Sequence, residues 1–168
     1  MERDMDNGMI GRRELIGLVG VGVVALMLGS TSGLAVSAGK FQVTHTPADW
    51  RRLLGAERYA ILREASTERP YSSPLLNEHR KGFFVCAGCG LPLFSSATKF
   101  DSHTGWPSFF RALPNAIVTR SDRSLVIERI EVLCRRCGGH LGHVFDDGPK
   151  PTGLRYCMNG LALKFVPA

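Results

Sequence analysis

The sequence predicts a mostly β, antiparallel domain that begins with short helices and is held together by a structural zinc site. From Lys81 onward, the segments are short, rich in Phe, Val and Ile, and separated by Gly and Pro, as in antiparallel sheets. Two Cys-x-x-Cys-Gly motifs in this region offer the four thiols of a zinc site. With 168 residues and 44% hydrophobic side chains, the chain has enough apolar material for one ordinary globular domain.

Residues 1–38 are predicted to be a signal peptide. Arg12 and Arg13 precede an uncharged apolar run from Leu15 to Gly29, and small residues follow up to the expected cleavage point. The arginine pair resembles a twin-arginine signal, with general secretion left open. The uncharged stretch from Leu15 to Val36 is also long enough for an uncleaved anchor. We therefore expect an exported, periplasmic protein, with anchoring to the inner membrane as the alternative.

The remaining domain, residues 39–168, is basic. Without residues 1–38, the chain keeps 18 basic and 11 acidic side chains, a net charge of +7. Such a charge can indicate binding to nucleic acid or to a membrane surface. The basic residues are scattered, however, and an exported protein rarely meets nucleic acid. We interpret the charge as a solvated surface, and we expect no nucleic-acid partner and a membrane contact only if the signal is not cleaved.

The elements of the domain are predicted in order. Thr46 and Pro47 resemble a helix cap followed by proline at the first helical position, and apolar residues on helical spacings around Gly55 predict two short helices. The stretch 124–134 does not alternate cleanly, which indicates a bulge or burial on both faces. In the last predicted strand, Leu163 and Phe165 alternate with Lys164 and so give one face to the core. The predicted strands are GFFVC (82–86), AIVTR (116–120), SLVIERIEVLC (124–134), GHLGHVF (139–145) and LRYCMNGLALKFV (154–166).

The two cysteine pairs are the strongest chemical signal. They read CAGCG and CRRCG, with thiols at Cys86, Cys89, Cys134 and Cys137, and the glycine that ends each motif is expected to permit a tight turn around the thiols. Four thiolates make a closed tetrahedral zinc site, in which no water can be activated, so we expect one structural Zn²⁺ per chain. The alternatives are two disulfides or two redox-active pairs. The 44 residues between the pairs exceed the spacing of a simple zinc ribbon, so the metal is expected to join distant parts of a larger fold.

The fifth cysteine, Cys157, is left without a partner. A free thiol is often a small buried hydrophobic group. Here Arg155 and Asn159 stand beside it, and His140 and His143 lie upstream in GHLGHVF. A cation favours the thiolate and an imidazole supplies protons, so Cys157 is a candidate nucleophile. A spacing of three places the histidines on opposite faces of a strand, unless Gly142 bends it.

Longer motifs complete the pattern. TERP, CAGCG, TKFDS, GWPSF, CRRCGGHLGHVFDDGPKPTGLRYCMNG and LKF, in this order, resemble the B-type methionine sulfoxide reductases over about residues 45–166. This resemblance implies two antiparallel sheets forming a tent-like sandwich with small helices at its edge. It also implies reduction of the R epimer of methionine sulfoxide.

The resemblance also implies roles for individual residues. Cys157 stands at the position of the nucleophile, which becomes a sulfenic acid, and Asn159 at that of a residue that positions the substrate. His140 and His143 match the histidines that protonate the departing oxygen and hold water. The indole of Trp106 is expected to contact the S-methyl group of the substrate. The remaining expectations are Phe145 and Arg155 in the substrate pocket, and Cys86, Cys89, Cys134 and Cys137 as zinc ligands.

The chain departs from the family at one position. Many members carry a resolving cysteine before the tryptophan, where this chain has Thr104, and no other cysteine is available. We therefore expect the enzyme to be recycled by an external thiol or a thioredoxin-like protein. The expected substrate is methionine-R-sulfoxide in oxidised proteins, and the protein is expected to be a monomer. The competing classes are a zinc-stabilised binding module with a buried Cys157 and a thiol-disulfide oxidoreductase.

Overall fold

The computed structural model describes residues 41–124 and 127–168. The predicted signal peptide, residues 1–38, lies outside the described residues, so export and cleavage stay predictions. Within the two described ranges, no helix is both long and apolar enough to cross a membrane.

Helix α1 (Pro47–Glu64) consists of two helical segments, as predicted. The Thr46 hydroxyl accepts a hydrogen bond from the Asp49 amide at 3.1 Å and so caps the first turn. Pro47 takes the first helical position, where its missing amide hydrogen costs nothing. Gly55 breaks the helix with φ 72° and ψ 171°. The second segment then buries Tyr59, Ile61 and Leu62.

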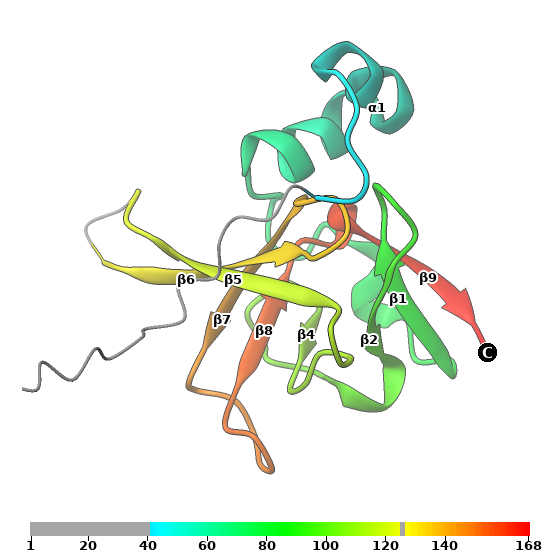
Figure 1. The fold of residues 1–168 in the computed structure, drawn as a ribbon. Coiled ribbons are helices and arrows are strands. Elements are labelled where there is room, and N and C mark those ends of the chain that lie inside the picture. Colours follow the sequence, from blue (N-terminus) through cyan, green and yellow to red (C-terminus); the bar gives the residue numbers. More distant parts are fainter. Residues whose placement is uncertain (1–40, 125–126) are drawn as a thin grey trace, which may run out of the picture. The chain divides into compact units, whose positions relative to one another are not determined.

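The strands among the described residues form two antiparallel sheets (Figure 1), which confirms the predicted mostly β class. The smaller sheet has the order β2-β1-β9 and the larger one the order β3-β4-β8-β7-β6-β5. The smaller sheet contains β1 (Gly82–Cys86), β2 (Pro92–Ser95) and β9 (Leu163–Pro167). The larger sheet contains β3 (Lys99–Phe100), β4 (Ser108–Phe109), β5 (Ile117–Asp122), β6 (Arg129–Cys134), β7 (His140–Phe145) and β8 (Arg155–Met158). The connections between elements of the described residues contain the 3₁₀ turns η1 (Pro74–Asn77), η2 (Ser96–Thr98) and η3 (Gly160–Ala162).

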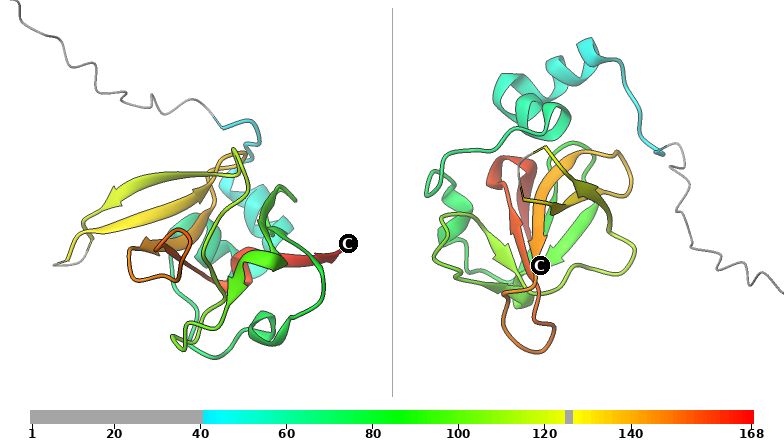
Figure 2. Two further views of the ribbon diagram at one scale, coloured as in Figure 1. Left: turned by 90° about the horizontal axis from the view of Figure 1, so that it is seen from below. Right: turned by 90° about the vertical axis from the view of Figure 1, so that its left-hand side faces the viewer.

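Aromatic side chains join the two sheets. Phe94 of β2 stacks on Phe109 of β4 with ring centroids 4.4 Å apart. Phe84 of β1 meets the same Phe109 ring edge-on at 4.9 Å. All three rings are fully buried, so their apolar area is removed from water between the sheets. Helix α1 lies over one end of the strands, as Figure 2 shows.

The last predicted strand is wrong as a single element. Residues 154–166 form two strands, β8 and β9, which belong to different sheets and are separated by η3. The chain turns there because Asn159 starts a 3₁₀ turn at the end of β8. Leu163 faces the core and Lys164 is exposed, as predicted, whereas Phe165 is half-buried. The sequence analysis also missed the short strands β2, β3 and β4.

The irregular stretch that ends in β6 has both features that were predicted for it. All four residues from Glu131 to Cys134 are buried, so both faces of the strand are covered. Its pairing with β7 contains a bulge: Val132 opposes Gly142, whereas Leu133 opposes His140. Leu141 is therefore the extra residue. This bulge determines how the histidines of β7 are arranged.

Candidate functional site

Cys157 lies in the middle of the larger sheet, on β8. Its ladder partners are Ser108 on β4 and His143 on β7. Residues directly opposite each other on an antiparallel ladder point to the same face, so His143 and Cys157 share one face of the sheet. Cys157 is half-buried, and its sulfur lies 3.7 Å from the hydroxyl of Thr104. The thiol is thus reachable from solvent and has an imidazole beside it.

A cleft of about 120 Å³ opens above Cys157. Larger depressions, of about 330, 420 and 710 Å³, also occur among the described residues, and none of these three is lined by a cysteine. The chemistry of the lining therefore identifies the site better than its size does. The structure brings five of the predicted site residues together in this small cleft. Its lining residues are Thr67, Trp106, Arg129, Gly142, His143, Phe145, Cys157 and Asn159.

His143 is bonded to a carboxylate on the neighbouring hairpin. Its Nε2 lies 2.8 Å from Oδ2 of Asp122, which also accepts a hydrogen bond from Arg129 at 2.7 Å. Hydrogen bonds, first from Ser124 and then from His143 and Arg129, hold the pKa of Asp122 below its usual 3.8. An ionised carboxylate only accepts hydrogen bonds, so Nε2 of His143 carries the proton. The Nδ1 atom is then the one that can take up or release a proton, and the carboxylate stabilises the charged ring.

His140 differs from His143 because it is only 3% exposed. Its Nδ1 lies 2.7 Å from Oε1 of Glu131, and Glu131 is paired with Arg120. Burial lowers the pKa of His140 below 6.5, although the neighbouring Glu131 acts in the opposite direction. His140 is therefore neutral at neutral pH. Its Nε2 has no hydrogen-bond partner among the described residues and is free to accept one.

The two histidines do not lie on opposite faces as on a regular strand; the alternative that was left open, an irregular strand near Gly142, holds. Their ring centroids are 5.4 Å apart. Because the bulge adds one residue to β7, the side chains of His140 and His143 lie on the same side of the strand although they are three positions apart. Gly142 has φ 152°, and a Cβ there would lie 2.1 Å from the carbonyl oxygen of Cys157. The sequence GHLGHVF thus needs glycine at this position to bring β7 close to β8.

Asn159 and Trp106 are joined by a residue that the sequence analysis missed. The Glu68 amide donates to Oδ1 of Asn159 at 3.0 Å, and Nε1 of Trp106 donates to the Glu68 carbonyl at 3.2 Å. The buried Glu68 carboxylate accepts hydrogen bonds from the amides of Gly160 and Leu161. Glu68 therefore holds both cleft residues through its main chain. The position of Glu68 in the TERP motif was the sequence signal that could have identified it.

Phe145 lines the cleft as predicted, whereas Arg155 is not among the lining residues and contacts the Phe145 ring instead. The Arg155 guanidinium binds Asp147 through two hydrogen bonds of 2.8 Å and lies 4.4 Å from the centre of the Phe145 ring. These contacts, first the hydrogen bond from Arg155 to Asp147 and also the nearby sulfur of Cys157, raise the pKa of Arg155. Arg155 is therefore a permanent cation that holds Phe145 in place. Arg129, which also lines the cleft, had no recognisable signal in the sequence.

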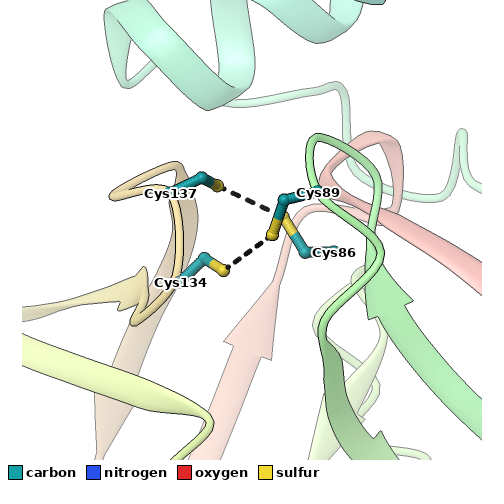
Figure 3. Close-up of side chains that lie close together, drawn as sticks. All are labelled: Cys86, Cys89, Cys134 and Cys137. Carbon is teal, nitrogen blue, oxygen red and sulfur yellow. Dashed lines mark hydrogen bonds between the residues drawn. The ribbon is translucent and has the colours of Figure 1, made fainter. Parts of the chain in front are cut away.

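The other four cysteines form a separate cluster, shown in Figure 3. Cys86 and Cys89 come from the β1–β2 turn, and Cys134 and Cys137 from the β6–β7 turn. Their sulfurs all lie within 4.8 Å of one another, with the closest pairs 3.5 and 3.7 Å apart. No disulfide joins them, and all four thiols are free. Tetrahedral bonds of about 2.3 Å to a metal place sulfurs about 3.8 Å apart, so the cluster fits a four-thiolate metal site.

The two turns that carry the cluster are built alike. The amide of Gly90 donates to the Cys86 carbonyl, and the amide of Gly138 to the Cys134 carbonyl, each at 2.8 Å. Both glycines have left-handed φ values, 72° and 68°. The glycine after each Cys-x-x-Cys therefore closes its turn, as the repeated motif predicted. Through these turns the cluster connects the two sheets.

Comparison with known proteins gives a consistent result. Residues 54–167 match the family model described as SelR domain. Similar proteins from several organisms carry the name peptide methionine sulfoxide reductase MsrB, among them the following three. The protein from Leptospira interrogans is 49% identical over 126 residues, which cover 74% of this chain and 96% of that protein. The one from Agrobacterium fabrum is 51% identical over 127 residues (75% and 94%), and the one from Thiobacillus denitrificans is 54% identical over 123 residues (73% and 93%).

Proposed function

The chain belongs to the MsrB family of peptide methionine sulfoxide reductases and reduces the R epimer of methionine sulfoxide, and we propose that Cys157 is its nucleophile. The observation that carries this proposal is the position of the Cys157 thiol, directly opposite His143 and within the cleft that Trp106 and Phe145 line. An oxidised methionine needs such a combination: an apolar wall for its methyl group, a nucleophile for its sulfur and a proton source for its oxygen.

The chemistry follows from these positions. The thiolate of Cys157 attacks the sulfoxide sulfur, and the oxygen takes up two protons and leaves as water. A water molecule then attacks the Cys157 sulfur, which breaks the new sulfur–sulfur bond, releases methionine and a proton, and leaves a sulfenic acid on Cys157. The net change is one thiol plus one sulfoxide giving one thioether plus one sulfenic acid. His143 is the proton donor, because it shares the face of Cys157 and Asp122 stabilises its charged form. His140 stays neutral, and its free Nε2 accepts a hydrogen bond from a water or a hydroxyl group.

The substrate side chain is held mainly by apolar contact. The Trp106 ring, fixed by its hydrogen bond to the Glu68 carbonyl, offers its face to the methyl group. Phe145 covers the other side, supported by the Arg155 guanidinium. Asn159 contributes less directly to substrate binding, because its side-chain oxygen already accepts from the Glu68 amide and its side-chain nitrogen donates to the Leu141 carbonyl.

The four-cysteine cluster holds a structural Zn²⁺ in this proposal. Cys86, Cys89, Cys134 and Cys137 supply four thiolates, which is the preferred ligand set of structural zinc. Because all four positions are filled by protein, the metal contributes folding free energy and takes no part in the reaction. A thiol-disulfide exchange function is then excluded for these cysteines, because a zinc-bound thiolate is not available to exchange.

Export and recycling complete the proposal. Residues 1–38 carry the features of a twin-arginine-like signal, which supports a periplasmic enzyme that repairs oxidised exported proteins. Thr104 stands 3.7 Å from Cys157, where it cannot form a disulfide. The sulfenic acid is therefore reduced by an external thiol or a thioredoxin-like protein: two thiols give one disulfide, one water and the restored Cys157 thiol. We propose a monomeric enzyme.

The decisive experiment assays both sulfoxide epimers with the purified protein and with Cys157→Ser. The parent protein is expected to reduce the R epimer alone, and the variant to lose this activity while it keeps its zinc content and melting temperature. Turnover by Cys157→Ser above about one thousandth of the parent rate would contradict the assignment of the nucleophile.

A further inference from the structure

Three hydroxyl groups connect Cys157 to a main-chain carbonyl. The Cys157 sulfur lies 3.7 Å from the Thr104 hydroxyl, which lies 2.8 Å from the Ser102 hydroxyl. Ser102 lies 2.7 Å from the Ser108 hydroxyl, and Ser108 donates to the carbonyl oxygen of Trp106 at 3.1 Å. This linear hydroxyl chain, formed by Thr104, Ser102 and Ser108, has four contacts and ends on a group that can only accept.

The surrounding turn holds the hydroxyl chain in place. The Tyr71 amide donates to the Gly105 carbonyl at 2.7 Å, and the Tyr71 hydroxyl donates to the His103 carbonyl at 2.8 Å. A Cβ on Gly105, whose φ is 92°, would lie 2.9 Å from the Tyr71 amide nitrogen. Ser108 is 1% exposed and pairs with Cys157 on the ladder. Both ends of the hydroxyl chain are therefore tied to the backbone around the nucleophile.

Counting hydrogens fixes the direction of the bonds. Each hydroxyl and the thiol carry one hydrogen, and the Trp106 carbonyl carries none. To fill the last contact, Ser108 must donate to the carbonyl, so Ser102 donates to Ser108 and Thr104 donates to Ser102. The thiol of Cys157 must then donate to Thr104. Only this arrangement satisfies all four contacts, and it requires a protonated thiol.

Ionisation of Cys157 leaves three hydrogens for the same four contacts. A thiolate attracts a donor strongly, so Thr104 turns its hydrogen toward the sulfur and gives up its bond to Ser102. One contact of the hydroxyl chain is then left unfilled, and this opposes ionisation. The bond from Thr104 to the thiolate favours ionisation.

We propose that Thr104 is a catalytic residue that accepts the hydrogen of the Cys157 thiol and donates to its thiolate, and that Ser102 and Ser108 set the cost of this reversal. The proposal rests on the assignment of Cys157 as the nucleophile. The thiol proton itself leaves to His143 or to solvent through the cleft, since every hydroxyl keeps its own hydrogen.

The test measures how alkylation of Cys157 by iodoacetamide depends on pH, read by mass spectrometry on the Cys157 peptide of the full chain. In Ser102→Ala and Ser108→Ala, Thr104 can donate its hydrogen to the thiolate, and every contact that remains in the hydroxyl chain still has a hydrogen. The pH midpoint of alkylation is expected to fall by about 0.4 to 1 unit, which corresponds to one hydrogen bond. In Thr104→Val, the thiolate loses its donor and the midpoint is expected to rise. Thr104→Ser keeps the hydroxyl and is the matched control, with a midpoint close to that of the parent.

Charged groups around Cys157 also affect this midpoint. They are His143 on β7 and Arg129 on β6, which line the cleft, and Arg155 on β8. All are present in each variant, so differences between variants report the hydroxyl chain. Opposite shifts in Ser102→Ala and Thr104→Val distinguish it from general loosening of the turn, which would move both midpoints in the same direction.

Shifts of the same sign, or equal midpoints in all variants, would overturn the proposal. This failure is separable from failure of the proposed function. If Cys157→Ser is inactive and the midpoints coincide, Cys157 remains the nucleophile and only the role of the hydroxyl chain is wrong. If Cys157→Ser is active, the nucleophile itself is wrong.

Discussion

The rings of His140 and His143 meet edge to face with centroids 5.4 Å apart, although side chains three positions apart on a regular strand point to opposite sides. The bulge at Leu141 brings them together, and separate carboxylates hold them: Glu131 bonds His140 and Asp122 bonds His143. The two imidazoles therefore lie close together in different surroundings. One is buried and neutral, and the other borders the cleft beside Cys157.

This difference predicts unequal roles in the reaction. His143→Ala removes the proposed proton donor and is expected to lower the single-turnover rate by about 100- to 10,000-fold, the usual range for general acid catalysis. Asp122→Asn, which keeps the ring but weakens support for its charge, is expected to cause a smaller loss. Rapid-quench assays with the R sulfoxide measure both. A His143→Ala rate within fivefold of the parent would assign the proton to another group.

The buried His140 predicts how stability depends on pH. Its folded-state pKa lies below the ordinary 6.5, so between these values the unfolded chain binds a proton that the folded protein does not. The contribution of His140 is complete above pH 6.5 and is lost as pH falls from 6.5 toward the lowered pKa, by at most about 1.4 kcal/mol per pH unit.

Urea unfolding between pH 5 and 8 measures this effect. In His140→Asn, the amide can still donate to Glu131 but does not titrate, so its free energy of unfolding is expected to fall less steeply below pH 6.5. Asp122 has a lowered pKa as well, but its contribution is lost only near and below pH 3.8, outside this range. Parallel curves for the parent and the variant would show that His140 charges equally in both states.

Glu68 is predicted to be a positioning residue. Glu68→Ala leaves the amides of Gly160 and Leu161 without their acceptor, which is expected to cost about 2 to 5 kcal/mol of unfolding free energy. It also loosens the main chain that holds Trp106 and Asn159, so KM is expected to rise more than kcat falls. Glu68→Gln keeps one acceptor oxygen and serves as the milder variant. A loss of kcat at unchanged KM would instead indicate a direct chemical role.

The sequence revealed the groups that do chemistry better than the way they are arranged. Both Cys-x-x-Cys-Gly turns could be predicted because their geometry is local and each glycine closes its own turn. The side shared by His140 and His143 could not, because it depends on which residue of β7 is extra when paired with β6. Glu68 escaped notice because its partners lie 38 to 93 positions away in the chain. The break between β8 and β9 at η3 was not predicted, because an apolar run has the same sequence pattern whether it forms one strand or two.

The metal site predicts a large effect on stability. Cys89→Ser is expected to release zinc and to destabilise the fold strongly, because a closed four-thiolate site contributes on the order of 10 kcal/mol in small domains. The cluster joins the β1–β2 and β6–β7 turns, so its loss separates the two sheets at that end. Metal content by atomic emission and thermal unfolding measure both outcomes, with Cys157→Ser as the control that keeps one zinc. An unchanged melting temperature with one zinc retained in Cys89→Ser would refute a structural metal.

The contact between Thr104 and Cys157 predicts how the enzyme is recycled. After one turnover without reductant, Cys157 is expected to persist as a sulfenic acid, because the proposed zinc site occupies the other four thiolates and Thr104 offers no sulfur. Dimedone should therefore label Cys157 in the parent protein. In Thr104→Cys, a second sulfur would stand at this 3.7 Å contact, so an internal disulfide is expected to form and the dimedone adduct to disappear. Mass spectrometry after a single turnover distinguishes these outcomes. A disulfide from Cys157 to Cys86, Cys89, Cys134 or Cys137 in the parent protein would show that the cluster takes part in recycling and is not a closed metal site.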